Sequence, residues 1–557
     1  MNSLLKNMPL WLVAFVVALL GLNLGGFLLF DHDEGAFSEA TRGMFERGDF
    51  ITTWLNDRVR FDKPILIYWL QAVSISLFGT EVWAFRLPSV LAGLGWVLGI
   101  FVFTRRHLSH DSAIAAALIA AGALGINMIS HVATADALLN CLLSGTLLAI
   151  YHYSQEPSNR TLYLIYLLMG LGVLTKGPVA VAIPLLAAVP YYLSVGMTQL
   201  LLKALFFIPG WALLLAVAAP WYIAEYIAQG QAFIDGFFLK HNVNRFNNAM
   251  EGHDGGFLFY PLVLPFLLAP FGALLLRSLG SAKSAIAGDS LNRFLWIWFL
   301  VVLVLFSIAS TKLPHYILYG CTPLVILMAR YRYLLKNRWF AVLFPVLFFG
   351  LFTAFPLLIP TIKAGLTNPI EIATAERAAF YINHDFAILS GLAGLVSIAL
   401  ILWKRLPVWH GLVATSVVQA LFVWCVFAPA FSEAQQRPVW QAAQFVRQLG
   451  QPVVTQSIDM PSFNVYLDKV TPRRGLEPGE IGFGRIDRIE NLESYQLLFQ
   501  SGPIVIIRRP DADDVPAPAS QPVEADNRKS PSVPTEASGA DSNVMGEKTV
   551  NDNEAKP

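Results

Sequence analysis

The chain has 557 residues, of which 55% are hydrophobic and only 14% are charged. Soluble domains carry roughly 25% charged residues, so the composition excludes an ordinary soluble protein and predicts a polytopic membrane protein. The formal net charge of +1 gives no electrostatic basis for nucleic-acid binding. The three cysteines, Cys141, Cys321 and Cys425, lie in or beside apolar runs, and we expect them to act as small hydrophobic side chains.

Apolar runs of membrane-spanning length recur along most of the chain. At ~20 apolar residues per span they predict an all-α bundle of about 13 transmembrane helices. The first run follows Lys6 and no small-residue cleavage site comes after it, so we expect an uncleaved helix. The predicted spans are residues 9–30, 82–103, 112–130, 136–153, 161–174, 178–196, 203–224, 257–276, 292–309, 314–330, 338–360, 386–403 and 408–429, with 161–174 and 178–196 open to being one interrupted pair.

Short basic loops recur between alternate spans, which is the pattern of cytoplasmic loops. The opposite, non-cytoplasmic face then receives residues 31–81, 225–256 and everything after about residue 430. These loops carry acids, histidines and aromatics as well as bases, which indicates a site there. The basic loops are Arg105-Arg106, Arg160, the stretch from Arg277 to Arg293, the stretch from Arg330 to Arg338, and Lys404-Arg405.

The first long loop, 31–81, is predicted to contain two helices. Residues 37–46 place apolar side chains on one side of a helix and Glu39, Arg42 and Glu46 on the other. This pattern is typical of an amphipathic helix that lies in the membrane interface. Residues 65–78 show the same tendency.

After residue 430 the composition changes to that of a small α/β domain, which we place at 431–509. Trp440 to Leu449 predicts a helix, and residues 452–454, 462–467 and 503–507 predict short strands. Residues 510–557 are rich in Pro, Ala, Ser, Asp and Glu and poor in large apolar residues, which predicts a disordered tail.

Two groups in the first loop are candidates for chemistry. Asp33 and Glu34 end the first span, where a carboxylate is costly enough to suggest function and can serve as a general base. Lys63 lies in Asp62-Lys63-Pro64, where proline restrains the backbone and an ammonium suits a lipid phosphate. The alternatives are an acid facing the headgroups and a lysine that snorkels.

The segment 30–86 resembles the GT-C class of membrane glycosyltransferases, which use polyprenyl-phosphate sugar donors. The class includes the lipid A aminoarabinose transferases and the protein O-mannosyltransferases. The resemblance rests on Asp33-Glu34, Glu39, Arg42, Gly48-Asp49-Phe50, Asn56, Asp62-Lys63-Pro64, Tyr68-Trp69, Phe78-Gly79 and Arg86.

This resemblance implies an enzyme that moves a sugar from an undecaprenyl-phosphate-type donor to a lipid A, lipopolysaccharide or protein acceptor, with inversion at the anomeric carbon. Asp33 would be catalytic, with Glu34 in support. The donor phosphate would be held by Lys63, Arg245, Lys312 and Tyr316. Acceptor or structural support would come from Asp136, Asp62, His241 and Arg42.

The resemblance assigns no cofactor and identifies no metal ligands. It does not decide whether the enzyme requires a divalent metal ion. Phe37 is a departure, since the aminoarabinose transferases have a tyrosine four residues after the catalytic aspartate. Lys176 matches a family motif to which we assign no chemistry. A transporter or flippase of lipid-linked sugars is the alternative, but such proteins place charges near the midplane on repeated halves, and this chain has its charges at helix ends.

Overall fold

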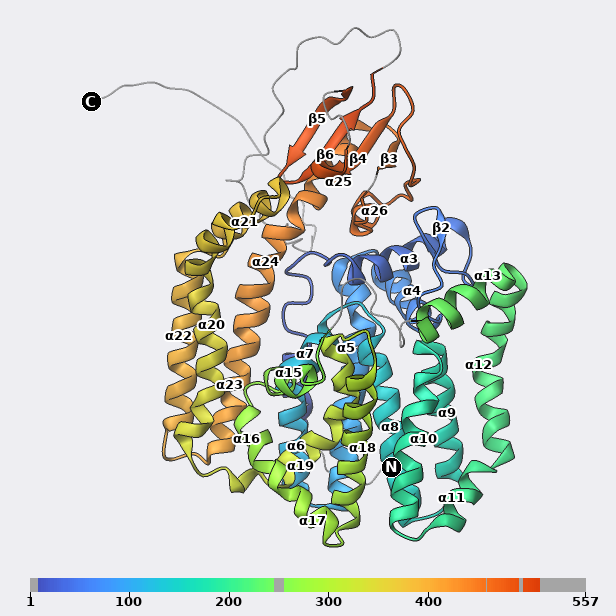
Figure 1. Ribbon diagram of the computed structural model, residues 1–557, viewed down its shortest axis with the longest axis vertical. Coiled ribbons are helices and arrows are strands. Elements are labelled where there is room, and N and C mark those ends of the chain that lie inside the picture. Colours follow the sequence, from blue (N-terminus) through green and yellow to red (C-terminus); the bar gives the residue numbers. More distant parts are fainter. Residues whose placement is uncertain (1–8, 245–254, 457, 490–493, 511–557) are drawn as a thin grey trace, which may run out of the picture.

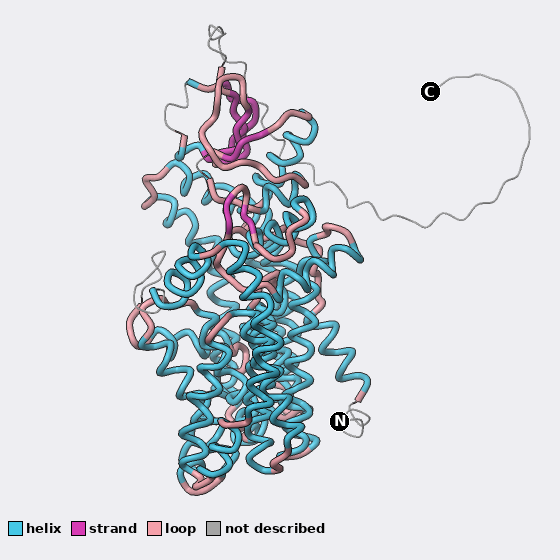
Figure 2. The backbone as a smooth tube through the Cα atoms, turned by 90° about the vertical axis from the view of Figure 1, so that its right-hand side faces the viewer, coloured by secondary structure: helices cyan, strands magenta, loops and turns pink. Residues whose placement is uncertain are grey.

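The computed structural model describes residues 9–244, 255–456, 458–489 and 494–510. In these residues long helices form a bundle, and a small mixed sheet stands at one end of it (Figure 1). The view turned by 90° shows this sheet at the top and a separate two-stranded hairpin below it (Figure 2). The predicted disordered tail, residues 510–557, lies outside the described part of the chain except for Pro510.

Each predicted span corresponds to one helix or to a broken series of helices. The helices up to residue 435 outside the first loop are α2 (Leu10–Leu20), α5 (Val82–His107), α6 (His110–Gly122), α7 (Leu124–His131), α8 (Asp136–Gln155), α9 (Asn159–Lys176), α10 (Val179–Ser194), α11 (Thr198–Leu205), α12 (Ile208–Gln229), α13 (Gln231–Phe233), the π-helix η1 (Ile234–Asn244), α15 (Phe259–Leu267), α16 (Gly272–Ser278), η2 (Leu279–Ser281), α17 (Ala282–Ile286), α18 (Ser290–Ile308), η3 (Pro314–Gly320), α19 (Cys321–Arg330), η4 (Arg332–Leu334), α20 (Arg338–Ala364), α21 (Pro369–Tyr381), α22 (His384–Leu402), α23 (Val408–Phe422), η5 (Val423–Phe427) and α24 (Ala428–Gln435).

Among the described residues, six helices are long and apolar enough to cross a membrane alone, and the pair α6–α7, bent by 60°, makes a seventh. Other predicted spans are short or interrupted: residues 9–30 hold a helix only over Leu10–Leu20, and 257–276 divide into α15 and α16. The chain is therefore a multi-pass protein with six or seven candidate spans, and the total of about 13 stays a prediction. The six are α5, α12, α18, α20, α22 and the continuous run Val408–Gln435.

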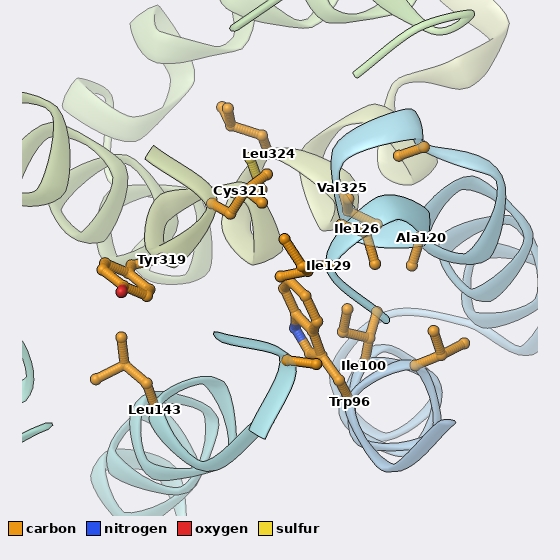
Figure 3. Packing of buried hydrophobic residues seen from close by; sticks show 14 of the residues in the cluster. Trp96, Ile100, Ala120, Ile126, Ile129, Leu143, Tyr319, Cys321, Leu324 and Val325 are labelled. Carbon is orange, nitrogen blue, oxygen red and sulfur yellow. The ribbon is translucent and has the colours of Figure 1, made fainter. Parts of the chain in front are cut away.

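The core of the bundle lies where α5, α6, α7, α8 and α19 meet (Figure 3). Trp96 of α5 is buried there, and its indole nitrogen donates to the Thr322 hydroxyl at 2.7 Å. Cys321 is fully buried among these side chains, as expected of a small hydrophobe. Helix α6 is rich in buried alanines, which let neighbouring backbones approach closely.

The loops predicted to be cytoplasmic contact one another at the end of the bundle away from the sheet. Arg106 pairs with Glu156, joining the α5–α6 and α8–α9 turns. Arg330 lies 2.7 Å from Asp289 and so joins α19 to the start of α18. Figure 1 shows α11 and α17 at this end and α3, α4 and the sheet at the other. The two sets of loops are thus separated as the charge pattern predicts.

The first loop folds as α3 (Asp33–Arg47), a hairpin of β1 (Trp54–Leu55) and β2 (Arg58–Val59), and α4 (Leu66–Phe78). Both predicted helices are confirmed. The polar side of α3 does not face solvent, because Glu39 and Arg42 pair with each other and are 1% and 5% exposed. Helix α3 ends at Gly48, whose φ of 68° is the left-handed conformation that glycine adopts readily.

The last described segment forms a four-stranded mixed sheet in the order β3-β4-β6-β5, with only β3 and β4 parallel. The predicted helix and two of the predicted strands are present. The prediction of a strand at 462–467 is wrong: this stretch is the helix α26, and all six of its side chains are buried. The elements are α25 (Arg437–Leu449), β3 (Val453–Thr455), α26 (Ser462–Leu467), β4 (Ile481–Arg485), η6 (Ile486–Arg488), β5 (Gln496–Ser501) and β6 (Ile504–Arg508).

Candidate active site

Asp33 is the first residue of α3, and its side chain is exposed at the end of the bundle that carries the sheet. A carboxylate in the first turn of a helix is stabilised by the positive end of the helix dipole. Its two acidic neighbours, Asp31 and Glu34, are both engaged by protein groups. Asp33 is therefore the acid of this cluster that a substrate can reach.

Glu34 is 2% exposed and accepts two hydrogen bonds from Arg86, at 2.6 and 2.8 Å. Backbone amides of Phe30 and Ala133 also donate to its carboxylate. These four bonds occupy the carboxylate, so Glu34 is placed to fix the start of α3 against α5 and the turn before α8. Glu34 thereby holds the residue that follows Asp33 in a fixed position.

Asp31 ties the start of α3 to the sheet end of the chain. Its carboxylate accepts from the backbone amide of Ser462 at 3.0 Å and from the Ser462 hydroxyl. Burial raises the pKa of Asp31 to about 7, although the bonds from Ser462 oppose the rise. Asp31 thus joins α3 to α26.

Arg60 was not singled out from the sequence, yet it lies at the centre of the first loop. It donates to the Tyr68 hydroxyl at 2.7 Å and to the Asp62 carboxylate at 2.9 Å, and its guanidinium lies 4.9 Å from the centre of the Phe37 ring. Burial alone would lower the pKa of Arg60, but the charges of its neighbours, including Asp33, raise it above the usual value. Phe37 has no hydroxyl, but Arg60 holds the hydroxyl of Tyr68 beside the Phe37 ring.

Lys63 follows Asp62 in the chain and adds a second cation beside the Arg60–Asp62 pair. We call Asp33, Arg60, Asp62 and Lys63 the row of charges of the first loop. The Lys63 ammonium donates to the Asp62 carbonyl at 3.0 Å and lies 3.5 Å from the Asp62 carboxylate. The side chain is 15% exposed. The charge of Lys63 favours the ionised form of Asp136. Gln71 of the same loop donates to the Ala133 carbonyl at 3.2 Å, so the first loop packs against the turn before α8.

Asp136 and Lys176 form a second cluster, built from α8, α9 and η3. The Lys176 ammonium donates to Asp136 at 2.5 Å and to the Tyr319 hydroxyl at 2.9 Å, and it lies 5.3 Å from the centre of the Tyr316 ring. The His315 ring lies 3.7 Å from the Asp136 carboxylate. The structure therefore brings Asp136 and Tyr316 together through Lys176, to which the sequence analysis assigned no chemistry.

Lys312 lies in a different environment from Lys63. It is 6% exposed and donates to the carbonyls of Ser307 and Ala309 at 2.9 and 2.8 Å, at the end of α18. Two of its three protons are thus used to cap a helix. Arg245 lies outside the described residues; His241 belongs to η1, and only its backbone is described.

Arg42, predicted to support the site, joins α3 to the C-terminal segment. It donates to both Glu39 oxygens, at 2.8 and 3.0 Å, and to Glu46 at 2.8 Å. Its guanidinium also lies 3.7 Å from Asp468. Within the described ranges, no group of three His, Cys, Asp or Glu side chains is arranged to hold a metal ion.

Comparison with known proteins gives one family match, which covers part of the chain. The profile of the dolichyl-phosphate-mannose-protein mannosyltransferases matches residues 62–223. This range contains Lys63, Asp136 and Lys176 but begins after Asp33.

Similar sequences cover just over half of the chain. An uncharacterized protein of Aquifex aeolicus is 30% identical over 304 residues, or 54% of this chain and 67% of that protein. The undecaprenyl phosphate-alpha-4-amino-4-deoxy-L-arabinose arabinosyl transferase of Edwardsiella ictaluri is 32% identical over 316 residues, or 55% of this chain and 56% of that protein. The match thus spans less than two thirds of the length of that transferase.

Similar folds extend over most of the chain. The crystal structure of ArnT from Cupriavidus metallidurans bound to undecaprenyl phosphate superposes with a TM-score of 0.75 at 20% identity. The superposition covers 91% of this chain and 99% of that one. The similarity of fold therefore extends well beyond the part of the chain that the sequence matches cover.

Proposed function

We propose that this chain, which belongs to the GT-C family of membrane glycosyltransferases, transfers a sugar from an undecaprenyl-phosphate-type donor to an envelope acceptor. The acceptor is lipid A, another part of lipopolysaccharide or a protein. The site lies on the periplasmic face of the bacterial inner membrane, and the anomeric carbon is inverted. These assignments extend to the whole chain what is known of relatives that match it in part.

The row of charges across the first loop carries this proposal. Exposed Asp33 interacts with Arg60, Arg60 pairs with Asp62, and Lys63 follows and acts on the Asp136–Lys176 cluster. A base at one end and cations at the other match what the reaction needs: a proton acceptor for the nucleophile and positive charge for the leaving phosphate.

The proposed reaction makes one bond and breaks one. Asp33 accepts the proton of the acceptor hydroxyl, whose oxygen forms a bond to the anomeric carbon of the sugar. The bond from that carbon to the phosphate oxygen breaks on the opposite face, and its electron pair stays with polyprenyl phosphate. Lys63, with Tyr316 and Arg245, stabilises this growing negative charge.

Support for the side of the membrane comes from the two ends of the bundle. The basic loops contact one another at the end away from the sheet, where the positive-inside pattern predicts the cytoplasm. The first loop and the sheet share the other end (Figure 1). The proposed site would then face the periplasm.

The proposal is tested by incubating purified protein with undecaprenyl phosphate that carries a radiolabelled sugar and with envelope lipids or proteins as acceptors. We expect label in one acceptor pool and release of undecaprenyl phosphate. Movement of the labelled donor across a vesicle bilayer with no labelled acceptor would instead favour a transporter.

A further inference from the structure

A second basic site lies between the start of α3 and the loops of the C-terminal sheet. It is a pocket of about 270 Å³, which we call the basic pocket. Drug-sized ligands occupy pockets of roughly 300–1,000 Å³, so this one suits a single small group. It is lined by His32, Ile458, Asp459, Met460, Arg473, Arg485 and Arg488.

The basic pocket carries more positive than negative charge. Its three arginines face the carboxylates of Asp459, 3.4 Å from Arg473, and Asp487, which accepts from Arg485 at 2.7 and 2.8 Å. Arg488 lies 3.8 Å from Asp487 and is 63% exposed. Among the described residues, the guanidinium groups of Arg473 and Arg488 form these ion pairs at 3.4 and 3.8 Å but donate no hydrogen bond, so their N–H groups can bind a ligand.

These groups favour a phosphate over an apolar or neutral ligand. The planar fork of an arginine matches the oxygens of a phosphate, and a bond between charged partners is stronger than a neutral one. The His32 ring, 64% exposed and 3.8 Å from Asp459, adds a further nitrogen at the mouth of the pocket. Ile458 and Met460 alone provide little apolar surface for a peptide side chain.

The basic pocket adjoins the proposed base. His32 directly precedes Asp33, and consecutive Cα atoms are about 3.8 Å apart. Asp31, on the other side of His32, is tied to Ser462 of the same C-terminal segment. The arginines belong to the sheet region, whereas Lys63 and Lys176 belong to the first loop and the bundle. The proposed base therefore directly follows a residue that lines the basic pocket, and that pocket is separate from the cations of the first loop and the bundle.

We infer that the basic pocket binds a phosphate group carried by a lipid acceptor, which anchors the acceptor while its hydroxyl reaches Asp33. The acceptor role rests on the proposed function, but the binding of phosphate does not. A lipid phosphate monoester and free phosphate share the chemistry that the pocket recognises, and the experiment separates them.

The first measurement is calorimetric titration of the full chain in detergent, with undecaprenyl phosphate added first to fill the donor site. The titrants are inorganic phosphate, dioctanoyl phosphatidic acid and, as the neutral-headgroup control, dioctanoyl phosphatidylcholine. We expect phosphatidic acid to bind more tightly than inorganic phosphate, and phosphatidylcholine not to bind. Equal affinity for phosphatidic acid and inorganic phosphate would overturn the lipid assignment.

The double variant Arg473→Gln/Arg488→Gln tests the pocket itself. Loss of a charge-assisted hydrogen bond of about 1.5–3 kcal/mol corresponds to weakening of roughly tenfold or more. The matched control is Arg474→Gln, which changes the next residue, an arginine paired with Glu480 outside the pocket. Equal affinities in the double variant and the control would overturn the site.

The acceptor role is tested by transfer of labelled sugar into envelope lipids. We expect the double variant to raise the apparent KM for the lipids about tenfold, with kcat and the KM for the donor unchanged. Weaker phosphate binding with an unchanged KM would overturn the acceptor role and leave only an anion site. If the parent protein transferred no sugar, the proposed function would fail, and the titration would still decide whether the pocket binds phosphate.

Discussion

Arg86 and Glu34 lie 52 residues apart in the chain and form a two-bond ion pair in which both side chains are almost completely buried. The same guanidinium donates to the carbonyls of Leu24, Phe27 and Leu28. All five of its N–H donors are therefore used. Because Asp33 directly precedes Glu34, this pair fixes the proposed base relative to α5.

Glu34→Gln should destabilise the protein. Removing one partner of a buried pair leaves the other charge uncompensated, at a cost of about 3–5 kcal/mol. Thermal unfolding in detergent measures the effect. The control is Glu156→Gln, which removes the exposed partner of Arg106 and should cost about 0–1 kcal/mol. A Glu34→Gln protein as stable as the control, but inactive, would make Glu34 a reacting group instead.

Asp33→Asn should lower transfer by about 10²–10⁴, because the amide cannot accept the proton of the acceptor. Donor binding and thermal stability should stay close to those of the parent, since the side chain is exposed. Asp57→Asn is the control, because Asp57 is an exposed acid at the tip of the β1–β2 hairpin in the same loop. Parental turnover by Asp33→Asn would place the base elsewhere.

Hydropathy and charge predicted the helices, the two groups of loops and an amphipathic helix over residues 37–46, because each depends on a local pattern. They did not predict that Glu39 and Arg42 are buried, because burial depends on α26, over 400 residues away in the chain. The helix at 462–467 was mistaken for a strand because all six side chains are buried, which removes the apolar–polar alternation that separates the two structures.

The same limit applies to the site. The family motifs picked out Asp33, Lys63 and Asp136, but a motif does not show which charged side chains contact one another. Arg60 lies in an unremarkable stretch of sequence, and only the fold brings it to Tyr68 and Asp62. The resemblance to the family predicted that Lys312 binds the donor phosphate. In the structure its ammonium donates two hydrogen bonds to carbonyls at the end of α18.

Between about pH 4 and 7, stability should fall as the pH rises, partly through Asp31. Its pKa is raised to about 7 in the folded protein from an ordinary value of 3.8. In this window the folded state holds a proton that the unfolded state has lost, so raising the pH favours unfolding. Asp31→Asn should reduce this slope in thermal unfolding, and Asp468→Asn, at an exposed acid, should not. If the stability of the Asp31→Asn variant changed with pH as steeply as that of the parent, Asp31 would not be a source of the pH dependence.

Glu477 and Lys404 should be on opposite sides of the membrane. Glu477 is 73% exposed in the loop before β4, and Lys404 is exposed between α22 and α23. In a cysteine-free background, an impermeant thiol reagent should label Glu477→Cys in spheroplasts and label Lys404→Cys only after lysis. Labelling of Lys404→Cys in intact spheroplasts would reverse the topology.

Lys63→Met and Lys312→Met should have different consequences, although both lysines were predicted to bind the donor phosphate. Lys63 lies between Asp62 and the Asp136 cluster, where loss of one fixed donor to a developing charge lowers the rate about 10²–10³-fold. Lys312 is buried and caps α18 through two carbonyls, so its loss should cost about 1.5–3 kcal/mol of stability per bond and leave turnover largely unchanged. Methionine keeps an unbranched apolar stem in both, so the comparison isolates the ammonium.

Turnover with a labelled polyprenyl-phosphate sugar and thermal unfolding separate the two effects. A stable Lys312→Met protein that had lost transfer would return Lys312 to the phosphate site, and parental turnover by Lys63→Met would remove Lys63 from it.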